Sequence, residues 1–156
     1  RVHNGMLLDE FYTYERDSAG AKIRVKASIE AANVFPFRVS ASPGVLLSSI
    51  RWEPLGEPGS VTLIRNRQFD GDTTFVFNGK TLPAIKFNVR ELVDNDQEGH
   101  LELEYPAMEI YAKGIGLVYF RKDIDEKWQM EYQLAATYTM AEFEKKFGQR
   151  IGSSGY

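Results

Sequence analysis

Apolar and polar residues alternate along most of this chain. In the clearest run every second position is apolar: Trp128, Met130, Tyr132, Leu134, Ala136, Tyr138 and Met140. A side-chain period of two is typical of a strand with one face buried, whereas the apolar face of a helix recurs at three and four. The pattern therefore predicts a long strand from 128 to 140 with these residues on its buried face.

Similar alternation, interrupted by turn-forming residues, divides the rest of the chain. Asp17-Ser18-Ala19-Gly20 and Asn78-Gly79 predict hairpin turns. Further candidate strands cover 6–16, 23–30, 35–42, 45–53, 61–69, 73–77, 81–93, 100–105, 108–113 and 116–122. We predict a mainly β protein, a curved antiparallel sheet or an open or half barrel of about nine to eleven strands.

Only the C-terminal segment predicts a helix. Thr139-Met140-Ala141-Glu142 has the form of a capping box, Phe143 and Phe147 share one helical face with Met140, and Gly148 is a suitable stop. A helix that follows the long strand directly would cover the same sheet face, with Phe143 and Phe147 as its plug. We expect residues 1–148 to form one β-rich domain and residues 149–156 a flexible tail.

Length and composition narrow the classes of function. The 156 residues fit one domain, and 19 Lys and Arg against 22 Asp and Glu give a net charge of -3, which argues against nucleic acid as a partner. The longest apolar stretch, Ile115 to Phe120, is too short to cross a bilayer, so we expect no transmembrane segment. There is no cysteine for a disulfide, a thiol nucleophile or a cysteine-rich zinc site. A chain that begins at Arg1 is expected to have been processed or cut from a longer one.

One loop resembles the first half of a calcium-binding loop. In Asp94-Asn95-Asp96-Gln97-Glu98-Gly99 the acidic residues Asp94, Asp96 and Glu98 occupy positions one, three and five, and a glycine occupies position six. Position twelve, where a bidentate glutamate would close the site, is Tyr105, and the flanking segments predict strands. We favour a solvated hairpin turn and expect no metal or other cofactor.

No motif for catalysis stands out. Acidic residues at Asp9, Asp70 and Asp72, with His100, would make a hydrolase plausible only if at least two of them converged in one cleft. The paired glycines of Gly114-Ile115-Gly116 precede a strand, so they predict a bulge or bend in place of a phosphate-binding loop. We therefore expect no catalytic residues and a protein that is not an enzyme.

The segment from Tyr111 to Phe120, Tyr-Ala-Lys-Gly-Ile-Gly-Leu-Val-Tyr-Phe, carries a family resemblance. With Gly71-Asp72-Thr73, Phe77-Asn78-Gly79 and the stretch from Leu82 to Phe87, it resembles the C-terminal half of exported, often lipid-anchored domains of unknown function in Gram-negative envelopes. The match covers Asp70 to Arg121. Those domains are similar in outline to half-open β-barrels that carry lipoproteins or lipids, which implies a location in the cell envelope, in the periplasm or at the outer membrane. No functional residue carries over.

The leading hypothesis is a non-enzymatic envelope domain that binds an apolar ligand, such as a lipid, or a protein partner on its curved sheet. Large aromatic and thioether side chains suit such contacts, so the candidate ligand-binding residues are Trp128, Met130, Tyr132, Tyr138, Phe143 and Phe147. The same residues would serve equally as core in a structural or interaction module with a filled interior, which is the first alternative. A hydrolase with a carboxylate and histidine site is the second.

Overall fold

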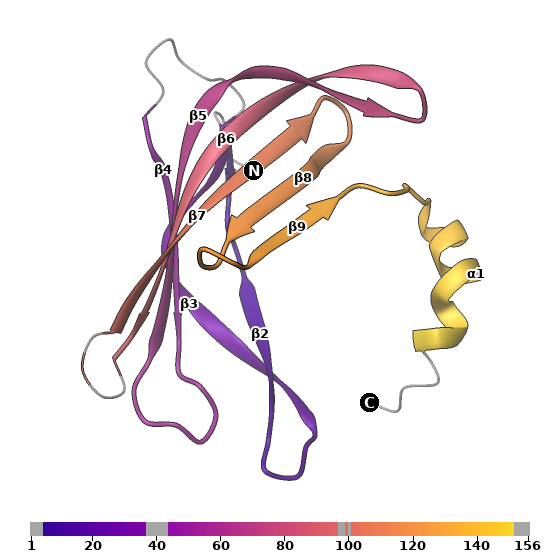
Figure 1. The fold of residues 1–156 in the computed structure, drawn as a ribbon. Coiled ribbons are helices and arrows are strands. Elements are labelled where there is room, and N and C mark those ends of the chain that lie inside the picture. The colour runs from indigo at the N-terminus through magenta and orange to yellow at the C-terminus, as the bar shows by residue number, and fades with distance from the viewer. Residues whose placement is uncertain (1–4, 37–43, 97–98, 100, 152–156) are drawn as a thin grey trace.

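The computed structural model describes residues 5–36, 44–96, 99 and 101–151 (Figure 1). Its elements are β1 (Gly5–Leu7), β2 (Phe11–Arg16), β3 (Lys22–Pro36), β4 (Leu46–Trp52), β5 (Val61–Phe77), β6 (Lys80–Asn95), β7 (Leu101–Ala112), β8 (Gly116–Asp123), β9 (Gln129–Gln133) and α1 (Met140–Ile151). The nine strands form one antiparallel sheet that does not close, and a single short helix follows them. The predicted mainly β class is confirmed, with an open sheet.

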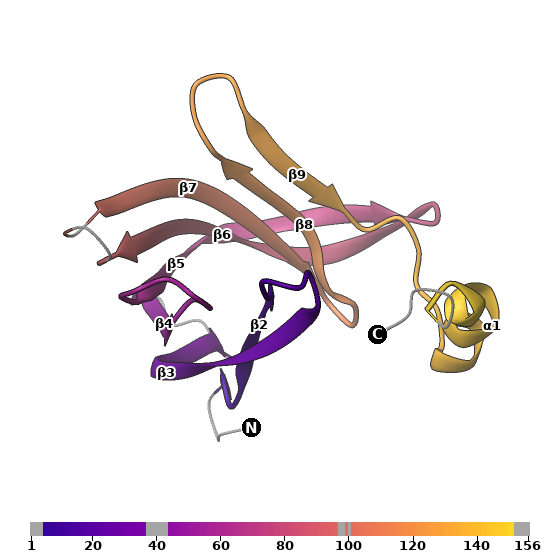
Figure 2. The same cartoon turned by 90° about the horizontal axis from the view of Figure 1, so that it is seen from below.

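The strands follow one another across the sheet as they do along the chain. From β3 to β9 each strand pairs with the next, while β1 and β2 both pair with β3. One edge is therefore formed by β1 and β2 and the other by β9. The two views show the sheet curving between these edges, with α1 beyond the end of β9 (Figures 1 and 2).

The tight turns follow from their residue types. Asn78 and Gly79 have φ angles of 50° and 73°, the left-handed conformation that a two-residue hairpin loop requires and that Asn-Gly adopts readily. In the β2–β3 turn Asp17 Oδ1 accepts hydrogen bonds from the backbone N–H groups of Ala19 and Ala21, at 2.9 and 2.8 Å. Both predicted hairpins are confirmed.

Two predicted breaks are absent from the long central strands. Residues 61–69 and 73–77 belong to one strand, β5, and the expected turn at Asp70–Asp72 is instead a β-bulge between Phe69 and Gly71. Gly71, with φ 123°, accommodates the extra residue without interrupting the pairing with β6. Likewise, 100–105 and 108–113 were predicted as two strands, and β7 spans 101–112 without a break.

The bulge reverses the alternation of side chains along β5. Before the bulge, Phe69 pairs with Phe87 of β6, and after it, Phe75 pairs with Leu82. Phe87 and Leu82 are five residues apart, so they point to opposite faces of the sheet, and so do their partners Phe69 and Phe75. Two buried clusters result. One contains Phe87, Val89 and Ala107, and the other contains Phe75, Ala84, Ala112 and Val118.

The face that carries Phe87 is the concave one. Residues from both edges of the sheet, Phe11 of β2 and Met130 of β9, line a common cleft on it, which requires the sheet to curl. Phe35 of β3 reaches across this face to the rings of Phe87 and Tyr111, with centroid distances of 5.8 and 4.8 Å. Because Phe87 is only 1% exposed, the centre of the concave face is filled.

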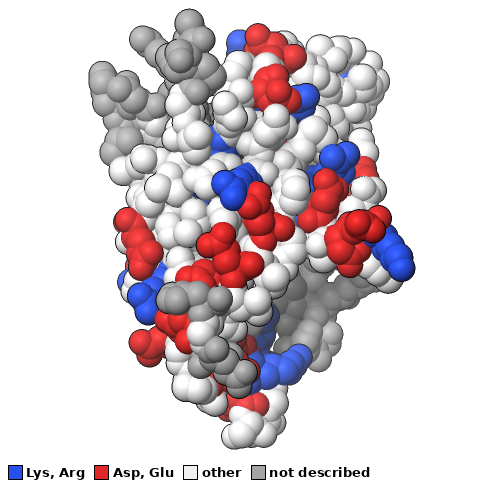
Figure 3. Space-filling model, turned by 60° about the vertical axis from the view of Figure 1, so that its left-hand side comes forward, with Lys and Arg blue, Asp and Glu red and all other residues white. Residues whose placement is uncertain are grey.

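The opposite side of the molecule carries mixed charges. Figure 3 shows acidic and basic side chains lying beside one another on the face that it displays. Ion pairs on the side of the sheet away from Phe87 include Lys86 with Asp70, at 2.6 Å, and Arg90 with Glu104. This intermixing gives the displayed face no field of a single sign.

The long C-terminal strand is shorter than predicted. The strand β9 ends at Gln133, residues 134–139 have no regular structure, and α1 begins at Met140. The neighbouring strand β8 begins at Gly116, so Leu134, whose N–H bonds the carbonyl of Val118 at 2.8 Å, is near the end of the available ladder. Alternating apolar residues do not extend a strand beyond the point where a neighbouring strand is available for backbone hydrogen bonds.

The capping box is confirmed. The backbone N–H of Thr139 donates to Glu142 Oε2 at 2.7 Å, and that of Glu142 donates to Thr139 Oγ1 at 3.3 Å. The helix does not end at Gly148 but continues to Ile151, so the tail predicted from residue 149 starts within it. Residues 152–156 lie outside the described part of the chain, as does most of the strand predicted at 35–42.

The buried face predicted from Trp128 to Met140 is wrong: Met130 and Leu134 are half-buried, and the other five apolar residues of the run are exposed. Trp128, Tyr132 and Met140 are 70%, 61% and 72% exposed, because β9 is an edge strand with a single neighbour and residues 134–139 have no regular structure. The helix does not cover the sheet as predicted either (Figure 1). Tyr138 and Phe143 pack on Phe147, at ring distances of 5.7 and 4.9 Å, so the expected plug is a cluster within the C-terminal segment.

Candidate functional site

A cleft with a volume of about 730 Å³ lies at one end of the concave face. We call it the large cleft. Strands β1, β3, β5, β6 and β7, the β7–β8 turn and the first residue of β8 supply its walls: Met6, Phe35, Asp72, Pro83, Ala84, Ile85, Tyr111, Ala112, Lys113, Gly114, Ile115 and Gly116. Only two of these residues are charged. Its size lies within the range of about 300–1,000 Å³ that is usual for small-molecule sites, most of which have apolar walls.

The glycine pair shapes the rim of the large cleft. Gly114 and Gly116 have φ angles of 80° and 108°, and the β7–β8 register shifts between Ile110 and Tyr111. The turn is held against β6 by the N–H of Lys113, which donates to the carbonyl of Pro83 at 2.9 Å. The predicted bend at these glycines is confirmed, and it leads into a strand.

Tyr111 forms part of the floor of the large cleft and also contacts charge. Its ring packs against Phe35, and its hydroxyl donates a hydrogen bond to Glu109 Oε2 at 3.0 Å. Burial, reinforced by the negative charge of Glu109, raises the pKa of Tyr111 to about 12. The phenol is therefore a neutral donor at physiological pH.

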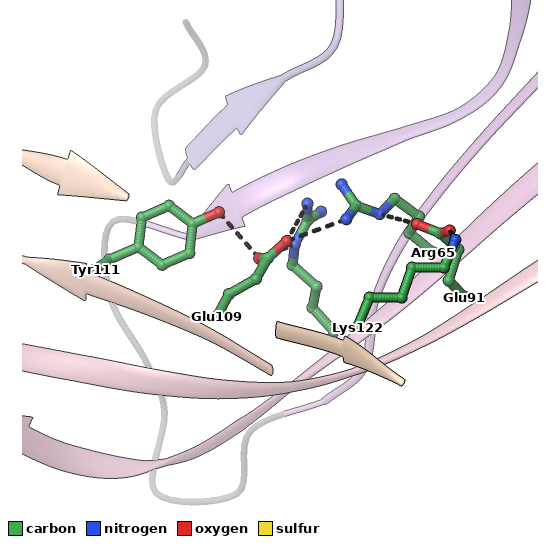
Figure 4. Close-up of polar contacts among 6 residues, drawn as sticks. Arg65, Glu91, Glu109, Tyr111 and Lys122 are labelled. Atoms are coloured by element: carbon green, nitrogen blue, oxygen red, sulfur yellow. Dashed lines mark hydrogen bonds and ion pairs between the residues drawn. The ribbon is translucent and has the colours of Figure 1, made fainter. Parts of the chain in front are cut away.

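A second cleft of about 330 Å³ lies on the same face. Its walls combine apolar and polar residues: Leu8, Phe11, Ser48, Ser49, Ile50, Leu63, Arg65, Arg67, Glu91, Phe120, Lys122 and Met130. Figure 4 shows the charged side chains that lie beside it. We define the charged cluster as Arg65, Arg67, Glu91, Glu109 and Lys122.

The charged cluster is a connected network. Arg67 Nε donates to Glu109 Oε2 at 2.7 Å, and the two side chains are only 5% and 2% exposed. Arg65 bridges the two carboxylates, with Nε 2.9 Å from Glu91 Oε2 and Nη2 3.3 Å from Glu109 Oε1, and Lys122 Nζ bonds Glu91 Oε1. Burial opposes the charge on Arg67, yet its bond to Glu109 keeps its pKa above the usual value. Such a network is costly to leave with one partner missing.

Of the residues predicted to bind a ligand, Met130 lines the second cleft. The other five, Trp128, Tyr132, Tyr138, Phe143 and Phe147, do not line either cleft within the described part of the chain. They lie on the edge strand β9 and in the C-terminal segment. Sequence reasoning therefore located one wall residue and missed the two clefts themselves.

The acidic loop has a structural role. Asp96 accepts hydrogen bonds from the N–H and the hydroxyl of Ser60, the latter at 2.8 Å, and pairs with Arg51 at 3.3 Å. Asp94 belongs to β6, where it pairs with Thr62, and Glu98 lies outside the described residues. In residues 5–36, 44–96, 99 and 101–151, no three His, Cys, Asp or Glu side chains are placed to hold a metal ion.

The candidate hydrolase residues lie in different settings. Asp70 pairs with Lys86, Asp72 lines the large cleft, and Asp9 lies between β1 and β2. His100 is outside the described residues.

Comparison with known proteins adds no assignment. No protein-family model, no curated protein and no solved structure matches this chain. In the part of the chain that the structure describes, α1 is the one helix, and it lacks the length and apolar character needed to span a bilayer.

Proposed function

We propose that this chain is a non-enzymatic binding domain that holds an apolar ligand in the large cleft. The observation that carries the proposal is a cleft of about 730 Å³ with a mainly apolar lining on a curved, open sheet. Segments far apart in the sequence converge there, from Met6 to Gly116. A preformed apolar concavity of this kind favours binding of small apolar molecules.

The side chains of the large cleft suit a flexible, weakly polar ligand. Phe35 and Tyr111 offer ring faces and edges, and Met6 offers an adaptable thioether chain. Lys113 and Asp72 are the only charged residues among the wall residues, so an acyl chain or another largely neutral molecule is the favoured class. We place its action in the cell envelope because of the resemblance of the Tyr111–Phe120 segment, and fractionation of source cells tests that placement.

A neutral fluorescent probe, N-phenyl-1-naphthylamine, tests the cleft directly. We expect saturable binding that Ile115→Asp weakens by at least about tenfold, because a carboxylate at the wall must lose water when the probe enters. Ile124→Asp is the matched control: Ile115 and Ile124 are 37% and 40% exposed, and Ile124 lies in the β8–β9 turn outside both clefts. Equal effects of the two substitutions would contradict the proposal.

Native mass spectrometry provides a second test. Protein purified without detergent is expected to carry an added mass that is released by organic solvent. A bare mass under gentle conditions, together with no probe binding, would count decisively against a ligand-binding role.

A second candidate function is contact with another protein. It is favoured by the exposure of Trp128 and Tyr132, at 70% and 61%, at the edge of the sheet formed by β9. Large apolar side chains exposed at a sheet edge are suited to contact with another protein. Chemical cross-linking in source-cell extract with wild-type protein and Trp128→Lys would test it, and an unchanged cross-linking pattern would argue against this surface.

A further inference from the structure

The charged cluster beside the second cleft is not balanced. Its cations are Arg65, Arg67 and Lys122, and its carboxylates are Glu91 and Glu109, so three positive charges meet two negative ones. Both carboxylates are enclosed, with side chains 9% and 2% exposed. Among these five side chains the positive charges exceed the negative ones by one.

The excess charge is best assigned to Arg65. Its side chain is 26% exposed, against 5% for Arg67 and 14% for Lys122. Its Nε lies 2.9 Å from Glu91 but is not directed at it, so within the described residues this buried N–H makes no hydrogen bond. A guanidinium has five N–H donors in a planar fork, so Arg65 retains capacity to bind an oxyanion.

A hydroxyl group lines the same cleft as this guanidinium. Ser48 of β4 pairs directly with Arg65 of β5, so both side chains project from the same face of the sheet. Ser48 is buried and lines the second cleft. The hydroxyl of Ser48 supplies an additional hydrogen-bond donor for a carboxylate bound in this cleft.

Apart from Ser49, the remaining walls are apolar. Leu8, Phe11, Leu63, Phe120 and Met130 enter the cleft from the strands and loops on both sides of Arg65. Phe120 also lies with its ring 5.8 Å from the Arg65 guanidinium carbon. A site with one cationic corner and apolar walls matches a molecule with one anionic end and an apolar body.

We propose that the second cleft binds the carboxylate of a small amphiphilic acid, of the medium-chain fatty acid class. Arg65 and Ser48 hold the carboxylate, whose single negative charge balances the cluster, and the apolar walls hold the chain. The volume of about 330 Å³ limits the apolar part to a short chain. This assignment concerns a different cleft from the proposed apolar site and does not depend on it.

The test uses three probes with the same chain and different head groups. Octanoate, 1-octanol and octylammonium are titrated separately into the whole chain by calorimetry. We expect octanoate to bind at least about tenfold more tightly than octanol, and octylammonium most weakly, because a charge-assisted hydrogen bond exceeds a neutral one. Equal affinity for octanoate and octanol would overturn the proposal, and this comparison needs no substitution.

Two substitutions then locate the site. Arg65→Gln is expected to remove the preference for octanoate over octanol and Ser48→Ala to reduce it, while Arg51→Gln, which alters an arginine outside the cleft, leaves it unchanged. Binding of N-phenyl-1-naphthylamine should be the same in all three variants. Loss of probe binding by Ile115→Asp without any octanoate preference would support the large cleft alone, and the reverse result would support the second cleft alone.

Discussion

The two clefts share a face and strands β5, β6 and β8 but differ in the chemistry of the side chains around them. Strand β6 contributes Ile85 and Phe87 toward the large cleft and its floor, and Glu91 to the charged cluster. Strand β7 likewise contributes Tyr111 to one and Glu109 to the other. Because inward positions recur every second residue, about 7 Å apart, the chemistry of the concave face changes completely over one or two steps along a strand.

The centre of the concave face should be the most sensitive position. We expect Phe87→Ala to lower the free energy of unfolding by about 3–5 kcal/mol, because it leaves a cavity under Phe35 and Tyr111. Chemical denaturation followed by tryptophan fluorescence measures the loss. Val76→Ala, at a 63% exposed position of the same hairpin, serves as control, and a similar loss there would show that the Phe87 cluster is not the main core.

Removing one carboxylate from the charged cluster should lower the free energy of unfolding. Glu109→Gln removes the carboxylate that Arg65 and Arg67 both contact, and we expect a loss of about 3 kcal/mol because this buried ion pairing is broken. Denaturant titration at neutral pH measures it. Glu104→Gln, at the exposed pair with Arg90, should change stability little; equal effects would mean that the cluster is not buried in solution.

Stability at alkaline pH should depend on Tyr111, which lines the large cleft and also donates a hydrogen bond to Glu109 of the charged cluster. The pKa of Tyr111 is about 12 in the folded protein against 10.0 for the ordinary phenol. The folded state holds the proton more tightly, so this contribution is complete below pH 10 and is lost as pH rises toward 12. Denaturation midpoints measured across this window should fall less steeply for Tyr111→Phe than for wild type. Tyr14→Phe, at a 60% exposed position, should follow wild type, and identical slopes for all three would contradict the assignment.

The smallest effect should come from the region outside both clefts. Thr139→Ala removes the helix cap and is expected to destabilise α1 by about 1 kcal/mol. Far-ultraviolet circular dichroism should lose helical signal, while the unfolding midpoint of the sheet and binding of N-phenyl-1-naphthylamine stay constant. A change in probe binding would show that the helix contributes to the large cleft.

Much of the fold follows from local signals in the sequence. Turn chemistry at Asn78-Gly79 and the reciprocal cap between Thr139 and Glu142 are decided within a few residues, so they could be predicted. The extent of the last strand could not, because pairing beyond Gln133 depends on where β8 begins. The bulge at Gly71 was equally hidden, since a turn and a bulge use the same residue types.

The charged cluster had a sequence signal that was not used. Arg65 and Arg67 stand between Leu63 and Phe69 at every second position, where the alternation calls for apolar residues. Glu91 interrupts β6 and Glu109 interrupts β7 in the same way. Charges at inward positions of successive strands predict a buried network, but which charges meet depends on register, and register was not available from the sequence.

The bulge in β5 determines which face of the sheet each later residue of that strand points to. Phe69 and Phe75 are an even number of residues apart and would share a face in a regular strand. They belong to different buried clusters only because the bulge inserts one extra residue between them. Deleting one residue at Asp70 would remove the bulge, restore regular alternation and leave Phe75 opposite Leu82 on its present face. Deleting one residue from the regular segment before Phe69 would instead turn part of the strand over, exchanging the side chains of its two faces. Deletions should therefore be tolerated at the bulge and in the turns around this strand but not in its regular segments.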